Sequence, residues 1–241
     1  MSKMALLSMS KVYEREDFYR PFINSYEYID CSDIDGTNCY VDKEALKELR
    51  RRLEGIDARG IHFIDSGNYH YLTHLFLEKI PREFELVLID KHPDCKASMF
   101  ESLMSCGSWV KDALFNLPNL KRVYMIGVDT ELLYELDDLG KCREQALVVR
   151  TPTKLSESKL PIYMSIDKDV LDSSITSTNW DQGNMSLEDL DKWIDYIISN
   201  RYLIGADICG EADYEAAIEE HNRNSEINSH LYDLLISSWQ R

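Results

Sequence analysis

The sequence predicts an α/β fold, a three-layer αβα sandwich with a mostly parallel central sheet, formed by a single domain over residues 1–241. Two observations predict it. Short apolar runs alternate along the chain with segments of helical periodicity, and parallel strands need long crossovers of this kind. The runs are also continuously apolar rather than alternating, as expected for strands that helices cover on both faces.

The strands are predicted from apolar runs that polar residues or glycine follow. The clearest runs are Ile61–Ile64, Leu86–Ile89, Val123–Ile126, Leu147–Val149, Ile162–Ile166 and Leu203–Ile208. A weaker candidate is Tyr26–Ile29. Ligands of such sheets gather beyond the carboxyl ends of the strands, so the chemistry of this chain is expected there.

Two helices have clear start signals. Asp42 is predicted to cap the first helix and Gly55 to end it. The apolar face of this helix carries Leu46, Leu49 and Leu53. Ser186 opens the second helix with a predicted capping box that Asp189 closes. Its apolar residues repeat at helical spacing: Leu187, Leu190, Ile194 and Ile197. The chain from Tyr214 onward is also predicted to be mostly helical.

Charge and composition exclude several classes of partner. The formal net charge is −16, which argues against nucleic acids and anionic membranes because both need lysine and arginine. No apolar run reaches the roughly 18 residues that cross a bilayer, and the N-terminus has no convincing signal-peptide core. We therefore expect a cytoplasmic protein whose six cysteines, which show no CxxC pairing, are reduced.

Acidic residues and histidines follow three of the predicted strands. They are His70 after the first, Asp90, His92 and Asp94 after the second, and Asp167 and Asp169 after the third. In an extended segment residues i and i+2 point to the same side, so the members of each group can converge.

Four carboxylates around one point repel each other unless cations balance them, and two divalent cations carry the matching charge. Oxygen ligands with a minority of histidine suit Mn²⁺, so two manganese ions per chain are predicted. Ions about 3.5 Å apart lower the pKa of a shared water and yield hydroxide near neutral pH. Asp and His at strand ends also form turns and caps, but the two motifs together favour the metal site.

These motifs resemble those of the ureohydrolase family, which includes arginase, agmatinase and formimidoylglutamase. Asp90–Asp94 is similar to the family's Asp-Ala-His-x-Asp motif, and Ser165–Asp172 matches Ser-x-Asp-x-Asp-x-x-Asp. Gly67–His70 more loosely resembles Gly-Gly-Asp-His. Order and spacing agree from about residue 60 to residue 210, and the resemblance implies an arginase-like fold.

The resemblance also implies roles for these residues. His70 and Asp94 would hold one manganese, His92 and Asp169 the other, and Asp90 and Asp167 would serve both. The hydroxide between the metals would attack a guanidinium carbon and release urea, and Asp94 is also assigned to the catalytic residues. Members of the family commonly form trimers or hexamers, so a homo-oligomer is implied.

The chain departs from the family pattern at several positions. Cys106 takes the place of a proton-shuttling histidine, although a buried cysteine also packs as a small hydrophobe. His74, one helical turn after His70, is an alternative proton carrier or a solvated histidine. Glu211 falls one residue later than the glutamate that holds the guanidinium in the family. Lys96, near the site, would favour a substrate that bears a carboxylate.

Three functions compete at this stage. The first is a binuclear manganese hydrolase acting on the C–N bond of a small, linear guanidino or amidino substrate. The second is a catalytically impaired metal-binding protein of the same fold, which Cys106 and the displaced Glu211 motivate. The third is a one-zinc deacetylase of a related fold, which the pair Asp167 and Asp169 disfavours.

Overall fold

The computed structural model describes residues 4–22, 25–98, 103–156 and 158–239. Its main sheet consists of β1 (Met4–Ser8), β2 (Tyr26–Asp30), β4 (Ile61–Phe63), β5 (Phe84–Ile89), β7 (Leu120–Ile126), β8 (Ala146–Val148), β9 (Ile162–Asp167) and β10 (Leu203–Cys209). A separate antiparallel pair consists of β3 (Tyr40–Val41) and β6 (Met104–Ser105).

The α-helices are α1 (Lys43–Arg52), α2 (Leu72–Leu77), α3 (Trp109–Asn116), α4 (Leu187–Asn200) and α5 (Ile218–Ile236). The 3₁₀ segments are η1 (Val12–Arg15), η2 (Arg20–Phe22), η3 (Gly67–Tyr69), η4 (Thr130–Gln145), η5 (Pro152–Ser156), η6 (Lys168–Val170) and η7 (Ser237–Trp239). All are short except η4, which has 16 residues and a kink at Gly140.

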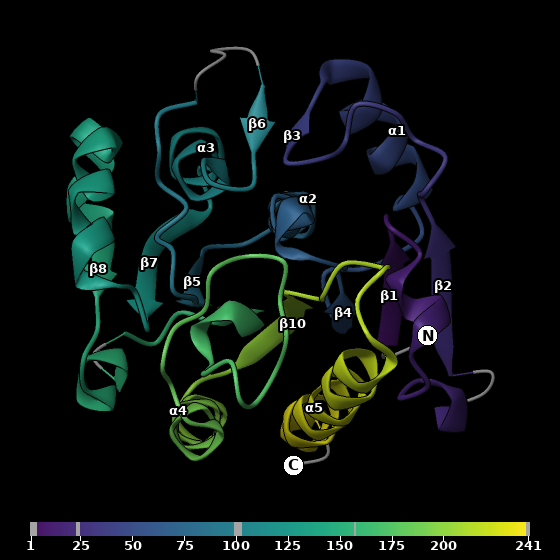
Figure 1. Cartoon of the computed structure of the whole chain (residues 1–241). Coiled ribbons are helices and arrows are strands. Elements are labelled where there is room, and N and C mark those ends of the chain that lie inside the picture. Colours follow the sequence, from purple (N-terminus) through teal and green to yellow (C-terminus); the bar gives the residue numbers. More distant parts are fainter. Residues whose placement is uncertain (1–3, 23–24, 99–102, 157, 240–241) are drawn as a thin grey trace.

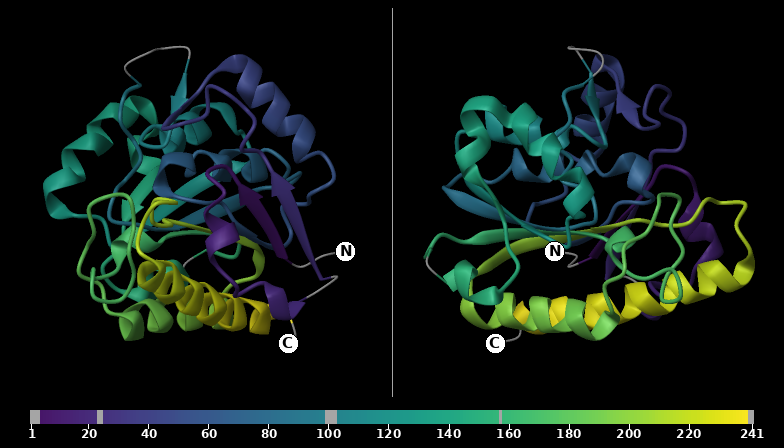
Figure 2. Two further views of the ribbon diagram at one scale, coloured as in Figure 1. Left: turned by 45° about the vertical axis from the view of Figure 1, so that its right-hand side comes forward. Right: turned by 60° about the vertical axis from the view of Figure 1, so that its left-hand side comes forward.

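The sheet has the strand order β2-β1-β4-β10-β9-β5-β7-β8, and every neighbouring pair is parallel (Figure 1). Helices α1, α2 and α3 cover one face, while α4 and α5 run along the other (Figure 2). Each face has its own apolar layer, with Leu49 and Leu75 in one and Ile194 and Leu231 in the other. The predicted αβα sandwich is confirmed.

All the predicted strands are present, including the weaker candidate at β2, with ends that shift by a few residues. The sequence missed β1, although its five residues are all buried. Met, Ala and Leu have high helix propensity, and only pairing between β2 and β4 makes this segment a strand.

The predicted helix starts are confirmed in their main features. The Asp42 carboxylate accepts from the backbone N–H groups of Glu44 and Ala45 at 3.0 and 2.8 Å, and α1 ends at Arg52, before the predicted stop. The Ser186 hydroxyl oxygen accepts from the N–H of Asp189 at 3.1 Å. The other contact of a capping box, from the Ser186 backbone N–H to the Asp189 carboxylate, is replaced. The Asp189 carboxylate instead accepts a hydrogen bond from the Ser186 hydroxyl at 2.9 Å.

The strand order decides where the chemistry lies. Strands β4, β10, β9 and β5 are consecutive neighbours in the middle of the sheet, so the segments that follow them meet at one edge. Among the described residues no helix combines the length and the apolar character needed to cross a bilayer.

Candidate metal centre

The carboxyl edge of each central strand carries at least one residue of a type that can bind metal. Asp167 ends β9, Cys209 ends β10, and Asp90 directly follows β5. His70 follows β4 through the single 3₁₀ turn η3. The parallel register pairs Cys209 with Asp167, so their Cα atoms lie on adjacent strands. Residues far apart in the sequence are thus brought to one point of the sheet.

His70 faces three carboxylates. Its Nδ1 atom lies 3.0 Å from Asp94 Oδ2 and 3.3 Å from Asp90 Oδ2. The Asp167 Oδ2 atom is 3.5 Å away. All four residues are buried. The arrangement offers one imidazole nitrogen and three carboxylate oxygens around a common point.

The second half of the centre is built around His92. Its Nδ1 atom lies 2.8 Å from Asp169 Oδ2 and 3.6 Å from Asp90 Oδ1. Asp90 therefore turns one oxygen toward each histidine. Within the described part of the chain, the buried Asp90 Oδ2 atom has no hydrogen-bond partner. A bare carboxylate oxygen inside a protein is unfavourable unless a cation meets it.

A second set of contacts orients the imidazole of His70. Its Nε2 atom lies 2.9 Å from the Ser165 hydroxyl oxygen, and that hydroxyl donates to Asp207 Oδ1 at 2.6 Å. Because the only hydroxyl proton goes to Asp207, Nε2 must carry the hydrogen of a neutral ring. The lone pair of the neutral ring is then on Nδ1, toward the carboxylates, which is the tautomer that a metal requires.

Asp94 reaches the centre through an unusual backbone conformation. Its φ is +50°, in the left-handed region that aspartate tolerates better than most residues. The indole N–H of the buried Trp109, on α3, donates to Asp94 Oδ2 at 2.6 Å. Helix α3 therefore holds this carboxylate in place.

The charges in the centre shift one another strongly. Burial lowers the pKa of His92, but the carboxylates of Asp169 and Asp90 outweigh it and raise the pKa to about 12. Burial, followed by the charge of Asp90, raises the pKa of Asp167 to about 6. Without a cation these groups retain protons to relieve their repulsion. A divalent cation would replace those protons.

The donor set fits divalent metal ions. Three groups have ligand atoms that all lie within 4.8 Å of one another: His70–Asp90–Asp94, Asp90–His92–Asp169 and His70–Asp167–Cys209. All of these residues except Cys209 line a cavity of about 40 Å³, large enough for small ions and water but not for a whole substrate. The Asp90 Oδ2 atom, which makes no hydrogen bond within the described residues and lies 3.3 Å from His70 Nδ1, supports the same conclusion.

The structure brings all six predicted metal ligands to this cavity, which Cys106 and Lys96 also line. Lys96 does not present a free charge, because its ammonium lies 3.2 Å from Glu135 Oε1. His74 is not among the lining residues: it is buried in α2, and its Nδ1 atom lies 3.1 Å from Glu78 Oε1.

Glu211 is not brought to the cavity either. Its carboxylate is fully buried and lies 2.6 Å from the ammonium of Lys168. Gly210 stands where the resemblance places the guanidinium-binding glutamate, and a side chain there would collide with Asp167. The φ of Gly210 is +89°, a conformation that favours glycine. The tight fit against Asp167 explains why the acidic residue stands one position later and is directed elsewhere.

The sequence reasoning missed two residues that line the cavity. Glu135 lies on η4 and is only 2% exposed, and Trp180 comes from the loop between β9 and α4. Trp180 packs on Gly67, where an added Cβ would lie 2.6 Å from the indole ring. An exposed tryptophan soon after a ligand motif was a usable signal for Trp180. Glu135 had none, because only tertiary packing brings η4 to the site.

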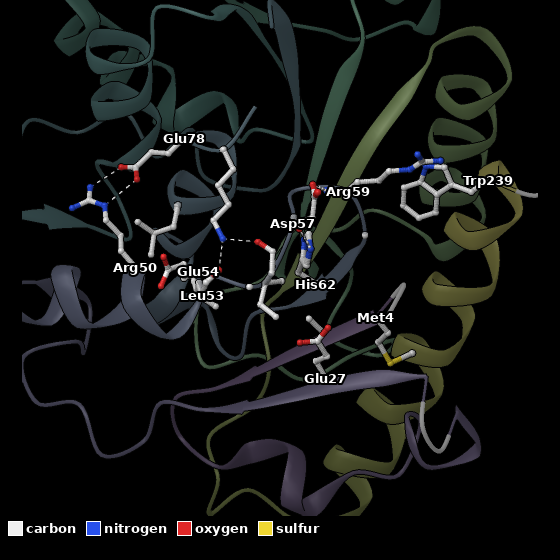
Figure 3. Close-up of a pocket in the computed structure, with 16 residues that line it drawn as sticks. Met4, Glu27, Arg50, Leu53, Glu54, Asp57, Arg59, His62, Glu78 and Trp239 are labelled. Carbon is white, nitrogen blue, oxygen red and sulfur yellow. Dashed lines mark hydrogen bonds and ion pairs between the residues drawn. The ribbon is translucent and has the colours of Figure 1, made fainter. Parts of the chain in front are cut away.

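A second and much larger cavity, of about 810 Å³, lies at the amino-terminal edge of β1 and β4 (Figure 3). Its lining includes His62, Trp239 and the ion pair of Arg50 with Glu78, whose nearest atoms are 2.6 Å apart. Within the described residues none of the three candidate metal groups lies there. Size alone therefore does not identify the functional site.

Comparison with known proteins agrees with the fold and the motifs. An uncharacterized protein of Thermotoga maritima is 32% identical over 210 residues, which cover 86% of this chain and 79% of the relative. The agmatine ureohydrolase of Thermoplasma volcanium has a similar structure, with a TM-score of 0.70 and 13% identity over 98% of this chain and 89% of that one.

A formiminoglutamase structure from Trypanosoma cruzi, which holds Mn²⁺, has a TM-score of 0.67 and 11% identity over 97% of this chain and 92% of that one. At such identities the two solved structures show the fold alone. The family model described as the Arginase family matches residues 3–212, most of the chain. This chain therefore belongs to the arginase family, and the predicted resemblance to the ureohydrolases is confirmed.

Proposed function

We propose that this protein is a binuclear metal-dependent hydrolase that cleaves the C–N bond of a small, linear guanidino or amidino substrate. The observation that carries the proposal is the convergence of four carboxylates and two imidazoles in one small cavity. Membership of the arginase family supports the reaction class.

The six ligands divide between two ions. His70 and Asp94 would hold one ion, and His92 and Asp169 the other, with Asp90 and Asp167 shared between them. We propose two Mn²⁺ ions per chain, because the donors are mainly carboxylate oxygens with a minority of histidine. The formiminoglutamase structure with Mn²⁺ supports this choice. Bound ions would supply Lewis acidity and lower the pKa of water toward neutrality.

The chain's own residues would then select and shield the substrate. Trp180 lies across Gly67 at the cavity, and the Trp180 and His92 ring centroids are 5.9 Å apart, so the indole excludes water from the metal side. Glu135 and Lys96 both line the cavity, and they form an ion pair with each other. The pair leaves less support for recognition of a cationic group by Glu135 or of a substrate carboxylate by Lys96.

Proton transfer to the leaving amine has fewer candidates. Asp94 receives the indole N–H of Trp109 at 2.6 Å and stands at the centre, so we propose it as the group that holds the transferred proton. Cys106 also lines the cavity and remains the candidate at the histidine position of the family. Glu211 pairs with Lys168, and His74 pairs with Glu78. We therefore assign neither Glu211 nor His74 a direct part in proton transfer.

The alternative is a metal-binding protein of the same fold that has lost catalysis. The burial of Glu211 against Lys168 favours it, because this chain then lacks a carboxylate at the family's guanidinium-binding position. Both functions require the metals and differ only in turnover.

The test is elemental analysis after reconstitution with Mn²⁺, followed by a screen for urea and ammonia release from guanidino compounds and formimidoyl amino acids. The proposal expects two ions per chain and turnover of at least one compound, lost on chelation. Two ions without turnover of any member supports the non-catalytic alternative. One zinc per chain, with deacetylation and no release of urea or ammonia, supports the deacetylase-like function instead.

Assembly is a separate part of the proposal. The family resemblance implies a trimer or hexamer, and light scattering of the purified protein tests the oligomeric state directly. A monomer at micromolar concentration contradicts that part and leaves the metal centre unaffected.

A further inference from the structure

One side chain at the metal centre has no part in the proposed ligand set. Cys209 ends β10 beside Asp167, and its thiol is fully buried. Its sulfur, a ring nitrogen of His70 and a carboxylate oxygen of Asp167 all lie within 4.8 Å of one another. The thiol donates to the backbone carbonyl of Ser66 at 3.3 Å. A backbone carbonyl is a weak partner for a thiol, so this contact is readily exchanged.

These separations are compatible with ligands of one ion. A zinc ion takes sulfur at about 2.3 Å and imidazole nitrogen at about 2.0–2.1 Å, and two such ligands of a tetrahedral ion lie about 3.6 Å apart. The ligand atoms of Cys209, His70 and Asp167 all lie within 4.8 Å of one another, so a small contraction brings them to that geometry. The buried Asp90 Oδ2 atom, which makes no hydrogen bond among the described residues and lies 3.3 Å from His70 Nδ1, is a second observation that favours a cation beside this histidine.

The two halves of the centre differ in their donors. The group of Asp90, His92 and Asp169 offers only nitrogen and oxygen, whereas the group of His70 and Asp167 also includes sulfur. Thiolate ligands favour softer ions such as Zn²⁺, while carboxylates suit Mn²⁺. Because only one side of the centre has a sulfur donor, the two sides should differ in the ion that they prefer.

We propose that Cys209 is a thiolate ligand of the ion that His70 and Asp167 hold, and that this half of the centre therefore binds a borderline-soft cation such as Zn²⁺ or Co²⁺ more tightly, relative to Mn²⁺, than the other half does. The inference rests on the proposed metal centre and adds a seventh ligand to it. When the ion binds, a metal–sulfur bond replaces the S–H bond, and the thiol proton leaves for solvent. The contact with Ser66 is given up in the same step.

X-ray absorption of the unmodified protein, loaded with one equivalent of Zn²⁺, tests the ligand directly. The expected result is a sulfur scatterer at about 2.3 Å from zinc. A shell of nitrogen and oxygen alone overturns the inference. This measurement needs no substitution, so it does not depend on whether a variant folds.

The variants Cys209→Ser and Cys106→Ser form a matched pair, because both cysteines belong to the centre and both changes replace sulfur with oxygen. Wild type and Cys106→Ser loaded with Co²⁺ should show a thiolate-to-cobalt charge-transfer band in the near ultraviolet. Cys209→Ser should lose this band and at least about tenfold in Zn²⁺ affinity, with Mn²⁺ affinity at the other subsite little changed. Loss of the band in Cys106→Ser instead assigns the sulfur to that residue and overturns the proposal.

The outcomes also separate this inference from the function on which it rests. Two ions per chain bound by nitrogen and oxygen alone, with hydrolysis intact, contradict only the role of Cys209. Failure of the chain to bind any divalent ion contradicts the proposed metal centre and the thiolate ligand with it.

Discussion

Two buried charged clusters meet at residues 167–169, and they balance their charges in opposite ways. Asp167 and Asp169 turn into the metal centre, while Lys168 between them turns into a second group, the lysine cluster. The lysine cluster consists of Lys168, Glu211, Glu16, Asn224 and Asn228, all buried. Neighbouring residues thus belong to two clusters. The lysine cluster contains the ammonium of Lys168, and the metal centre contains no lysine or arginine among its six residues.

The lysine cluster is nearly complete in itself. The ammonium of Lys168 lies 2.6 Å from Glu211 Oε1 and donates to the side-chain carbonyl of Asn228 at 2.9 Å. The amide of Asn228 donates to Glu16 and Glu211, and that of Asn224 to the other oxygen of Glu211. Burial, followed by the charge of Glu211, raises the pKa of Glu16 well above its usual value. The ammonium of Lys168 pairs directly with the carboxylate of Glu211.

The metal centre has no such balance. Its six residues include no lysine or arginine, and its four carboxylates outnumber its two imidazoles. The comparison teaches that burial of acidic groups does not by itself mark a functional site. What marks it is a set of carboxylates balanced only by imidazoles, whose protons a divalent ion can displace.

The largest expected effect follows from removing one carboxylate of the metal centre. We expect Asp167→Asn to lower kcat by about 10³-fold or more, because metal ions supply several kcal/mol of transition-state stabilisation. The measurement is steady-state hydrolysis together with metal content, and circular dichroism serves as the control for folding. A variant with normal activity and normal metal content shows that Asp167 is not a ligand.

The matching change in the lysine cluster should affect stability rather than metal binding. We expect Lys168→Met to lower the free energy of unfolding by about 3–5 kcal/mol, because it leaves Glu211 buried without its cation. Chemical denaturation measures the loss. The double variant with Glu211→Gln should recover part of it, while added Mn²⁺ should recover little. If Mn²⁺ alone restores the full free energy of unfolding, the metal balances the charge of Glu211 as well. The two clusters would then not be independent, contrary to the comparison above.

Removal of the metal should destabilise the protein by a smaller amount. At a free Mn²⁺ concentration 100 times its dissociation constant, binding stabilises the folded state by about 2.7 kcal/mol. For a chain of this size that corresponds to a rise in Tm of about 5–10 °C, reversed by a chelator. Scanning calorimetry with and without Mn²⁺ measures it. No shift in Tm at saturating metal contradicts a preformed site.

The smallest effect concerns pH. The pKa of Asp167 is raised to about 6 by burial and then by Asp90, and that of His92 is raised to about 12. A raised pKa means that the metal-free centre holds protons, which compete with the cation. The proton on His92 must be displaced at any pH below about 12, so Mn²⁺ affinity should fall by about tenfold per pH unit from neutral pH downward. The fall should become steeper below about pH 6, where Asp167 also holds a proton.

Titration calorimetry at pH 6 and pH 7.5, in buffers of different ionisation enthalpy, measures both the affinity and the number of protons released. We expect the metal centre to release protons when Mn²⁺ binds, because the metal replaces the protons that its carboxylates and imidazoles hold. An affinity independent of pH contradicts the assignment of Asp167 and His92 as ligands.

The sequence by itself determined the parts of this protein that depend on short-range geometry. The spacing of Asp90, His92 and Asp94, and of Asp167 and Asp169, directly after buried strands identified the candidate ligands, because residues two apart in extended chain share a side. The continuous apolar runs determined the parallel sheet, and Asp42 determined the start of α1.

Only the tertiary structure decided which side chains join those ligands. The strand order places Cys209 next to Asp167, and the loop after β9 brings Trp180 over the cavity. It also directs Glu211 to Lys168 and His74 to Glu78, away from the roles that the family pattern suggested. These partners are separated by many residues or share no local spacing rule. Their meeting depends on the order of strands and the packing of helices over them, which no local pattern encodes.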